Sequence, residues 1–158
     1  MRSKNVIVGF LVIVVLVSAG LLIKNYKKGR SVEPPIKPPV FEQVEAKFPG
    51  IKVPENADRA GLTGVSEAAG VGEAFRTYEN GRFNITVMAD LAATDAFYQA
   101  WMAKGDSYLS LGRMSLSKGG YIVEFSGNID YSDYSKIIVS REKALDGTIE
   151  EKVLEGSF

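Results

Sequence analysis

The chain has 158 residues, contains neither cysteine nor histidine, and carries as many acidic as basic side chains. The lack of Cys and His excludes disulfide bonds, Cys/His zinc sites and every nucleophilic triad that needs one of these residues. The net charge of zero is unevenly divided, because residues 1–30 carry +6 and residues 31–158 carry −6. A negative outer portion is repelled by phosphate backbones, which argues against a nucleic-acid partner.

The run from Val6 to Ile23 contains eighteen residues and no charged side chain. As a helix it would be ~27 Å long, close to the hydrocarbon thickness of a bilayer. Basic residues flank the run on both sides, and they suit anionic lipid headgroups. We therefore predict that residues 1–30 are a single-pass transmembrane anchor whose partner is the lipid bilayer.

Two questions about this anchor stay open. Val17, Ser18 and Ala19 offer a signal-peptide cleavage site after Ala19, although the apolar run continues beyond it. Four basic residues follow the run and two precede it, so the positive-inside count places the large domain in the cytoplasm. The short basic N-terminal tail and the signal-like layout favour the opposite orientation, and we expect an extracytoplasmic domain.

All six prolines lie between residues 34 and 54. The PPIKPP sequence favours an extended polyproline II path, which predicts a semi-rigid linker over residues 31–54 and one globular domain over residues 55–158. The alternative is a docking site for a proline-recognition domain. In the sequence FEQVEAKF, Phe41, Val44 and Phe48 have helical spacing, which predicts a short amphipathic helix that caps the domain.

Residues 49–72 are rich in Gly and Ala and have little periodicity, so we expect an ordered loop. The domain core then begins near Glu73 with two strands joined by Asn80-Gly81, the residue pair best suited to a type I′ hairpin turn. Side chains alternate along the second strand. One face carries Phe83, Ile85 and Val87, and the other carries Asn84, Thr86 and Met88.

Residues 90–105 show the features of an α-helix lying across a sheet. Asp90 or Thr94 can cap its start, and Gly105 occupies the position where a helix ends. Phe97 and Trp101 fall on one helical stripe, which predicts core packing rather than a ligand site.

Three further strands are predicted over residues 107–117, 120–127 and 136–142, the first bent at Gly112. The tail over residues 148–154 adds a last strand or a short helix. The resulting order is β-β-α-β-β-β, an α+β domain with one helix packed on an antiparallel sheet.

The sequence FPGIKVPENADRAG, a hairpin, and then AFYQAWMAKGD followed by paired strands resembles small membrane-anchored or secreted domains found widely in prokaryotes. The resemblance covers about residues 48–142 and departs from the pattern at Asp106-Ser107, where an aromatic residue often follows the glycine. The matching positions are Pro54, Ala57, Phe97, Tyr98 and Gly105. The resemblance implies an envelope domain with a helix that bears Phe-Tyr, and it implies no catalysis.

Oxygen ligands gather in the predicted loop between the strands at residues 120–127 and 136–142. Asn128, Asp130 and Asp133 could bind a hard cation, but the spacing lacks the central glycine and terminal glutamate of an EF-hand. A polar loop is the simpler interpretation. Ser117-Lys118 falls in a turn where the lysine stays hydrated and protonated, and Asn84-Ile85-Thr86 matches the glycosylation sequon within a strand.

Tyr121, Tyr131 and Tyr134 lie close together in the sequence and are our candidate interaction surface, because tyrosine buries area at low entropic cost. Tyrosines that cap a small sheet are the alternative. We expect a non-enzymatic, membrane-tethered interaction module, a subunit or accessory of an envelope assembly with a protein partner, and no catalytic, metal or cofactor site. The competing hypothesis is a calcium-type binding protein or a hydrolase that uses Asp130 and Asp133.

Overall fold

A computed structural model describes residues 39–65, 70–117 and 119–158. The predicted anchor, the PPIKPP segment up to Pro38, and Lys118 lie outside these residues. Within the described part of the chain, no helix combines the length and apolar character needed to span a bilayer.

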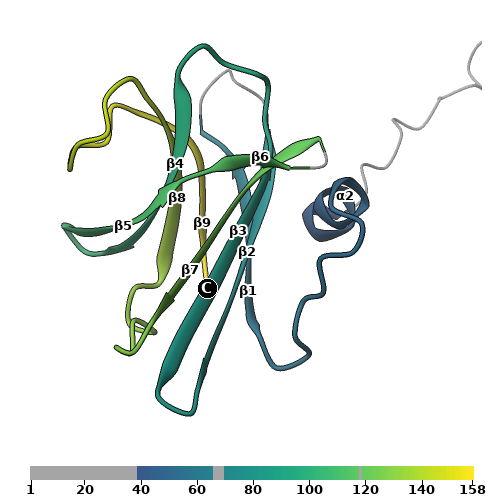
Figure 1. Cartoon of the computed structure of the whole chain (residues 1–158), viewed down its shortest axis with the longest axis vertical. Coiled ribbons are helices and arrows are strands. Elements are labelled where there is room, and N and C mark those ends of the chain that lie inside the picture. The colour runs from purple at the N-terminus through teal and green to yellow at the C-terminus, as the bar shows by residue number, and fades with distance from the viewer. Residues whose placement is uncertain (1–38, 66–69, 118) are drawn as a thin grey trace, which may run out of the picture. The chain divides into compact units, whose positions relative to one another are not determined.

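The described residues form one short helix and a sheet of nine strands (Figure 1). Their bounds are α2 Val40–Lys47, β1 Asp58–Gly64, β2 Val71–Glu79, β3 Arg82–Asp90, β4 Phe97–Lys104, β5 Ser107–Arg113, β6 Ser115–Ser117, β7 Gly120–Gly127, β8 Lys136–Glu142 and β9 Glu151–Ser157. The α+β prediction is therefore wrong, because the domain is mostly β.

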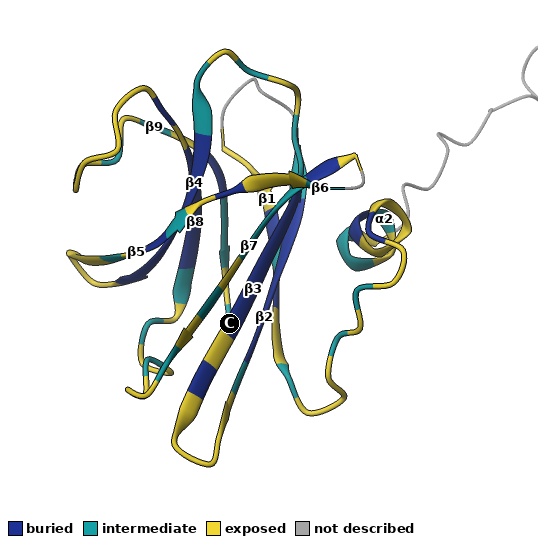
Figure 2. Cartoon of the chain, viewed as in Figure 1, coloured by how far each residue is buried: buried dark blue, intermediate teal, exposed yellow. Residues whose placement is uncertain are grey.

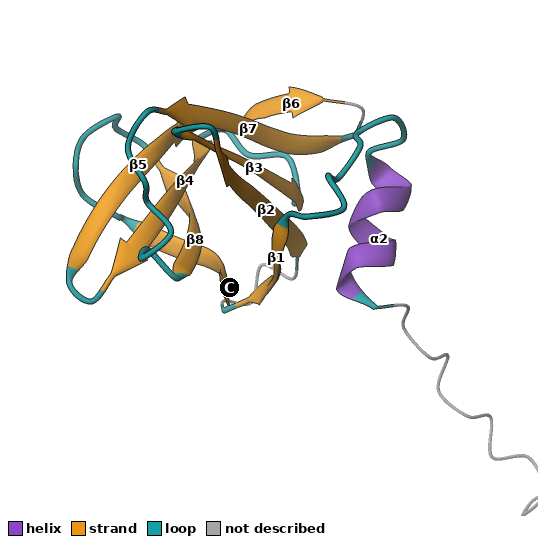
Figure 3. Cartoon of the chain, turned by 90° about the horizontal axis from the view of Figure 1, so that it is seen from below, coloured by secondary structure: helices purple, strands orange, loops and turns teal. Residues whose placement is uncertain are grey.

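The strand order is β5-β4-β8-β9-β1-β2-β3-β7-β6, and every neighbouring pair is antiparallel. The two end strands of this sheet, β5 and β6, are consecutive in the chain and are separated only by Met114. Strand β5 pairs with β4, whereas β6 pairs with β7. The chain therefore turns a corner at Met114 that joins the ends of the sheet into a nearly closed barrel (Figure 3).

The inner face of the barrel carries the main hydrophobic core, and the buried residues follow the strands that enclose it (Figure 2). Strand β3 shows how the alternation works. Phe83, Ile85 and Val87 are at most 2 % exposed and face inward. Two smaller clusters lie on the outer face, one beneath α2 and residues 48–57, the other around Trp101 on β4.

The helix predicted over residues 90–105 does not exist, and neither does the helix implied by the resemblance at Phe97 and Tyr98. That sequence forms β4, which pairs with β5 and β8. Six consecutive residues of β4 are buried, because its inner face lies in the core and its outer face is covered by the chain around Ile149. A strand buried on both faces loses the apolar–polar alternation that distinguishes a strand from a helix. Gly105 lies in the β4–β5 hairpin with a φ of +56°.

Other local predictions are confirmed. Asn80 and Gly81 have φ values of +52° and +75°, as a type I′ turn requires. The bend at Gly112 coincides with a register shift in the β4–β5 ladder. The short helix over FEQVEAKF is α2, and Val44 and the following Phe48 are buried against the outer face.

Strand β1 lies where a loop was predicted. Its sequence, DRAGLTG, holds only two buried side chains, Ala60 and Leu62, and it becomes a strand by pairing with β2 and β9. The tail forms β9, so the strand alternative predicted for it is correct and the helix alternative is not.

Candidate functional site

The structure separates the three candidate tyrosines. Tyr131 makes edge-to-face contacts with Phe83, Phe125 and Tyr134, at centroid distances of 5.5, 6.0 and 6.0 Å. Tyr121 instead contacts Tyr98 at 4.8 Å. The β3–β7 register places Tyr121 opposite Ala89 and the Tyr131 cluster near Phe83, roughly 20 Å away along the strand. All three tyrosines are partly buried against the core, so they do not form one exposed surface.

The two candidate metal-binding carboxylates have structural partners. Asp130 Oδ1 accepts a hydrogen bond from the Ser132 backbone N–H at 2.8 Å, and the hydrogen bonds from Ser132 lower the pKa of Asp130. Asp133 forms an ion pair with Lys104, which connects the loop to the end of β4. Within the described ranges, no three Asp or Glu side chains converge on a common point where a metal could bind. The carboxylates therefore stabilise a turn and a loop.

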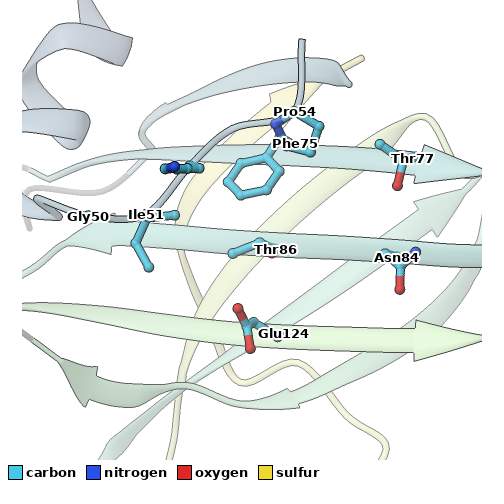
Figure 4. A pocket seen from close by; sticks show the side chains of 9 residues that line it. Gly50, Ile51, Pro54, Phe75, Thr77, Asn84, Thr86 and Glu124 are labelled. Atoms are coloured by element: carbon cyan, nitrogen blue, oxygen red, sulfur yellow. The ribbon is translucent and has the colours of Figure 1, made fainter. Parts of the chain in front are cut away.

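An open groove of about 360 Å³ lies on the outer face of β2, β3 and β7 (Figure 4). Residues 50–54 run along one side of it and contribute Lys52 and Pro54. The floor consists of side chains from the three strands, namely Phe75, Thr77, Asn84, Thr86 and Glu124. We take this groove as the candidate functional site.

Strand register fixes how the floor is arranged. Phe75 lies opposite Thr86, and Thr86 lies opposite Glu124, so these three side chains form one row across the sheet. Thr77 and Asn84 begin the next row. Side chains within a row are one strand spacing apart, ~4.8 Å, and the rows are ~6.8 Å apart along the strands. The groove thus presents a regular array of polar groups on a paired sheet.

Most polar groups of the array lack a side-chain partner, although Thr86 is only 9 % exposed. The hydroxyls of Thr77 and Thr86, the Glu124 carboxylate and the Lys52 ammonium form no side-chain hydrogen bond or ion pair with any residue that the structure describes. Asn84 differs, because its Oδ1 accepts a hydrogen bond from the Ser126 hydroxyl at 2.7 Å. This bond leaves the Asn84 amide N–H groups as donors.

Residues 50–54 are held over the sheet by the cluster beneath α2. Phe48 and Val44 pack on Phe75 and Met88, and Ile51 packs against the same cluster. Phe75 is only 7 % exposed, so its ring supports the groove from below more than it projects into it. The groove therefore lies directly beside this apolar cluster, and residues 50–54 border both.

A charged triad also connects α2 to the sheet. The Arg59 guanidinium contacts Glu45 of α2 at 2.6 Å and Glu73 of β2 at 2.6 Å, and it lies 4.4 Å from the centre of the Phe41 ring. Glu73 is fully buried, and its Oε2 atom has no hydrogen-bond partner among the described residues. Burial raises the pKa of Glu73 more than the hydrogen bond from Arg59 lowers it.

The groove was not predicted from the sequence. The alternation along β3 places Asn84 and Thr86 on the strand face opposite Phe83, which is correct, but the two residues were predicted only as part of a glycosylation sequon. Alternating polar residues on both strands of a hairpin were the available signal. Nothing in the sequence indicated that Lys52 or Glu124 would join them, because these residues meet only in the folded sheet.

Searches against protein-family models, curated proteins and solved structures find no match for this chain.

Proposed function

We propose that the chain is a non-enzymatic, membrane-tethered interaction module, a subunit or accessory of a cell-envelope assembly with its globular domain on the extracytoplasmic side. The observation that carries this proposal is the groove. Its free hydroxyl, amide and carboxylate groups stand in register on strands that are fixed by ladder pairing. A preordered set of hydrogen-bonding groups favours recognition, because little entropy is lost when a partner binds.

The tether rests on the sequence. The apolar run from Val6 to Ile23 is long enough to cross a bilayer as a helix, and the prolines after it favour an extended spacer. Helix α2 is the first described element after this spacer, and it packs on the sheet beside β1 and β2. An anchored chain would therefore enter the domain at α2, a few residues before residues 50–54, which form one side of the groove.

The chemistry of the lining residues favours binding over catalysis. The groove offers one carboxylate, Glu124, and one ammonium, Lys52, among hydroxyl, amide and apolar groups. Hydrolysis by a general acid and a general base of the glycosidase type uses two carboxyl groups, one on each side of the bond that breaks, whereas the groove lining includes one. Hydrogen bonding to a partner needs only the donors and acceptors that the floor supplies.

Three measurements on the full chain in its native membrane test this function. Carbonate washing should leave the protein in the membrane fraction, and Ser132→Cys should react with an impermeant maleimide on intact cells. A photo-crosslinking residue at position 77, in the groove, should form a discrete adduct that the same residue at position 148 does not form. Release by carbonate, an unreactive thiol at position 132 in folded protein, or identical adducts at both positions would each contradict the proposal.

A further inference from the structure

The groove has two chemically different sides. Pro54 and Ile51 supply apolar surface along one side, and Figure 4 shows the polar side chains Thr77, Thr86 and Asn84 extending across the neighbouring strands. A ligand that fits such a site has an apolar face and a rim of groups that both donate and accept hydrogen bonds. A sugar ring has this form, since its C–H groups lie on the faces and its hydroxyls lie around the edge.

We propose that the groove binds a neutral, extended glycan segment. This inference deepens the proposed function and rests on it in one respect, that the domain faces the compartment where envelope glycans lie. The Asn84 amide donates, the Thr77 and Thr86 hydroxyls donate and accept, and the Glu124 carboxylate accepts. Adjacent ring hydroxyls can satisfy all of these groups together.

The charges in the groove select for a neutral ligand. Lys52 and Glu124 carry opposite charges, and neither is neutralised by another side chain within the described ranges. A strongly anionic polymer would be repelled by Glu124, and a strongly cationic one by Lys52. A ligand without net charge can hydrogen-bond to both residues.

The pairing of the strands favours a glycan over a peptide. An extended peptide gains most of its affinity when its backbone adds to an unpaired strand edge. Beneath the groove, β2 is paired with β1 and β3, and β3 is paired with β2 and β7. The groove floor on these two strands therefore offers side chains and no free backbone edge. Strand β7, which carries Glu124, pairs with β6 only over residues 120–122, so a peptide strand could add only at the outer edge of β7, on the far side of Glu124 from Thr86. The groove volume of about 360 Å³ lies in the range of small-ligand sites.

The test is a titration of the full chain in micelles of a detergent without a sugar headgroup. Cellohexaose and chitohexaose serve as extended neutral probes, and maltohexaose serves as a coiled comparator. We expect one of the extended probes to bind more tightly than maltohexaose. Added salt should leave its affinity unchanged, because a neutral ligand makes no screened ion pair.

Matched isosteric variants locate the site. Thr86→Val and Thr77→Val each remove one hydroxyl and keep the side-chain shape, so each should weaken binding about three- to tenfold. Thr148→Val is the control, because Thr148 is exposed and lies outside the groove, and it should bind as wild type does.

Three outcomes would overturn the glycan assignment. They are no binding of either extended probe at millimolar concentration, equal binding in the Thr86→Val and Thr148→Val variants, and strong weakening by salt. If the crosslink at position 77 still gives a discrete protein adduct, the proposed function stands and the glycan inference alone fails. Release of shortened sugars during the titration would instead contradict the non-enzymatic function.

Discussion

The barrel has two outer patches that are covered in different ways. Helix α2 and residues 48–57, which together we call the α2 cover, lie over β2 and β3, where Phe48 packs on Phe75 and Met88. On the other side, Ile149 packs over Trp101 and Ile138 of β4 and β8. The first cover comes from the N-terminal end of the described domain, whereas the second is the connection between β8 and β9, which are paired strands.

The polar groups beneath the two covers differ as well. Under α2 the connection is ionic, because Arg59 joins Glu45 of the helix to the buried Glu73. Beneath Ile149 the two strands are joined by a hydrogen bond from Trp101 Nε1 of β4 to Ser140 Oγ of β8 at 2.8 Å. The Glu142 carboxylate also accepts a hydrogen bond from the Glu150 backbone N–H at 3.1 Å. The cover around Ile149 is thus held at both ends by the paired strands β8 and β9. The α2 cover precedes the first strand, and we expect it to open separately from the barrel.

The largest expected effect concerns the cover around Ile149. Trp101→Ala should lower the free energy of unfolding by ~3–5 kcal/mol, because it leaves a cavity between β4 and that cover. Urea unfolding of the full chain in micelles, followed by far-UV circular dichroism, measures this loss. Leu145→Ala is the control, because Leu145 is 71 % exposed and its removal should change stability by less than ~0.5 kcal/mol. Equal urea midpoints for the two variants would show that packing of Trp101 against the cover around Ile149 contributes little to the free energy of unfolding.

A matched pair of phenylalanines compares the α2 cover with the barrel interior. Phe83→Ala should cost ~3–5 kcal/mol of global stability. Phe48 is similarly buried, at 2 % exposed, but Phe48→Ala should cost only ~1–2 kcal/mol, because the loss cannot exceed the free energy of docking the cover. Urea unfolding of both variants checks the difference. Equal losses would mean that α2 unfolds only together with the barrel.

The buried Glu73 should make the stability of the α2 cover depend on pH. Because its pKa is raised in the folded state, its stabilising contribution is complete below the ordinary value of 4.5 and is lost as the pH rises through the raised pKa. The stability of wild type relative to Glu73→Gln should therefore fall as the pH rises from about 4.5. Thermal unfolding across this range measures it, with Glu42→Gln, an exposed position of α2, as the control. Parallel curves of stability against pH for wild type and Glu73→Gln would show that Glu73 does not cause the pH dependence.

The smallest expected effect is at the groove. Thr77→Val should change the free energy of unfolding by less than ~0.5 kcal/mol, because the Thr77 hydroxyl has no side-chain partner among the described residues and the new side chain has the same shape. The same urea experiment gives this value. A loss above ~1 kcal/mol would show that the hydroxyl supports the fold, and any binding defect of the variant would then need a structural explanation.

Strands β3 and β4 show which parts of the fold could be predicted from the sequence. The first half of β3 alternates between exposed and buried residues, and a turn with an unambiguous sequence precedes it, so the β2–β3 hairpin was predicted correctly. Strand β4 is buried on both faces, and its apolar residues satisfied helical spacing equally well. The outer face of β4 is apolar because the chain around Ile149 covers it. Ile149 lies 45 residues beyond the end of β4, so the local sequence of β4 does not reveal this cover.

The candidate site was hidden for a related reason. Asn84 and Thr86 were assigned to the correct strand face, yet a polar face on a hairpin is ordinarily no more than a solvated surface. Only the placement of residues 50–54 beside that face turns it into the floor of a groove. Their predicted role was that of a linker and loop, so the sequence carried no indication that Pro54 would line the same groove as Thr86.

Amide hydrogen exchange on the full chain in micelles can show whether the α2 cover opens separately from the barrel and forms one side of the ligand groove. In that case amides of α2 should exchange well before those of β4 and β8. An extended hexasaccharide that binds should then slow exchange in α2 by mass action. Equal protection of α2 and β4, or a bound saccharide that leaves α2 exchange unchanged, would contradict this prediction.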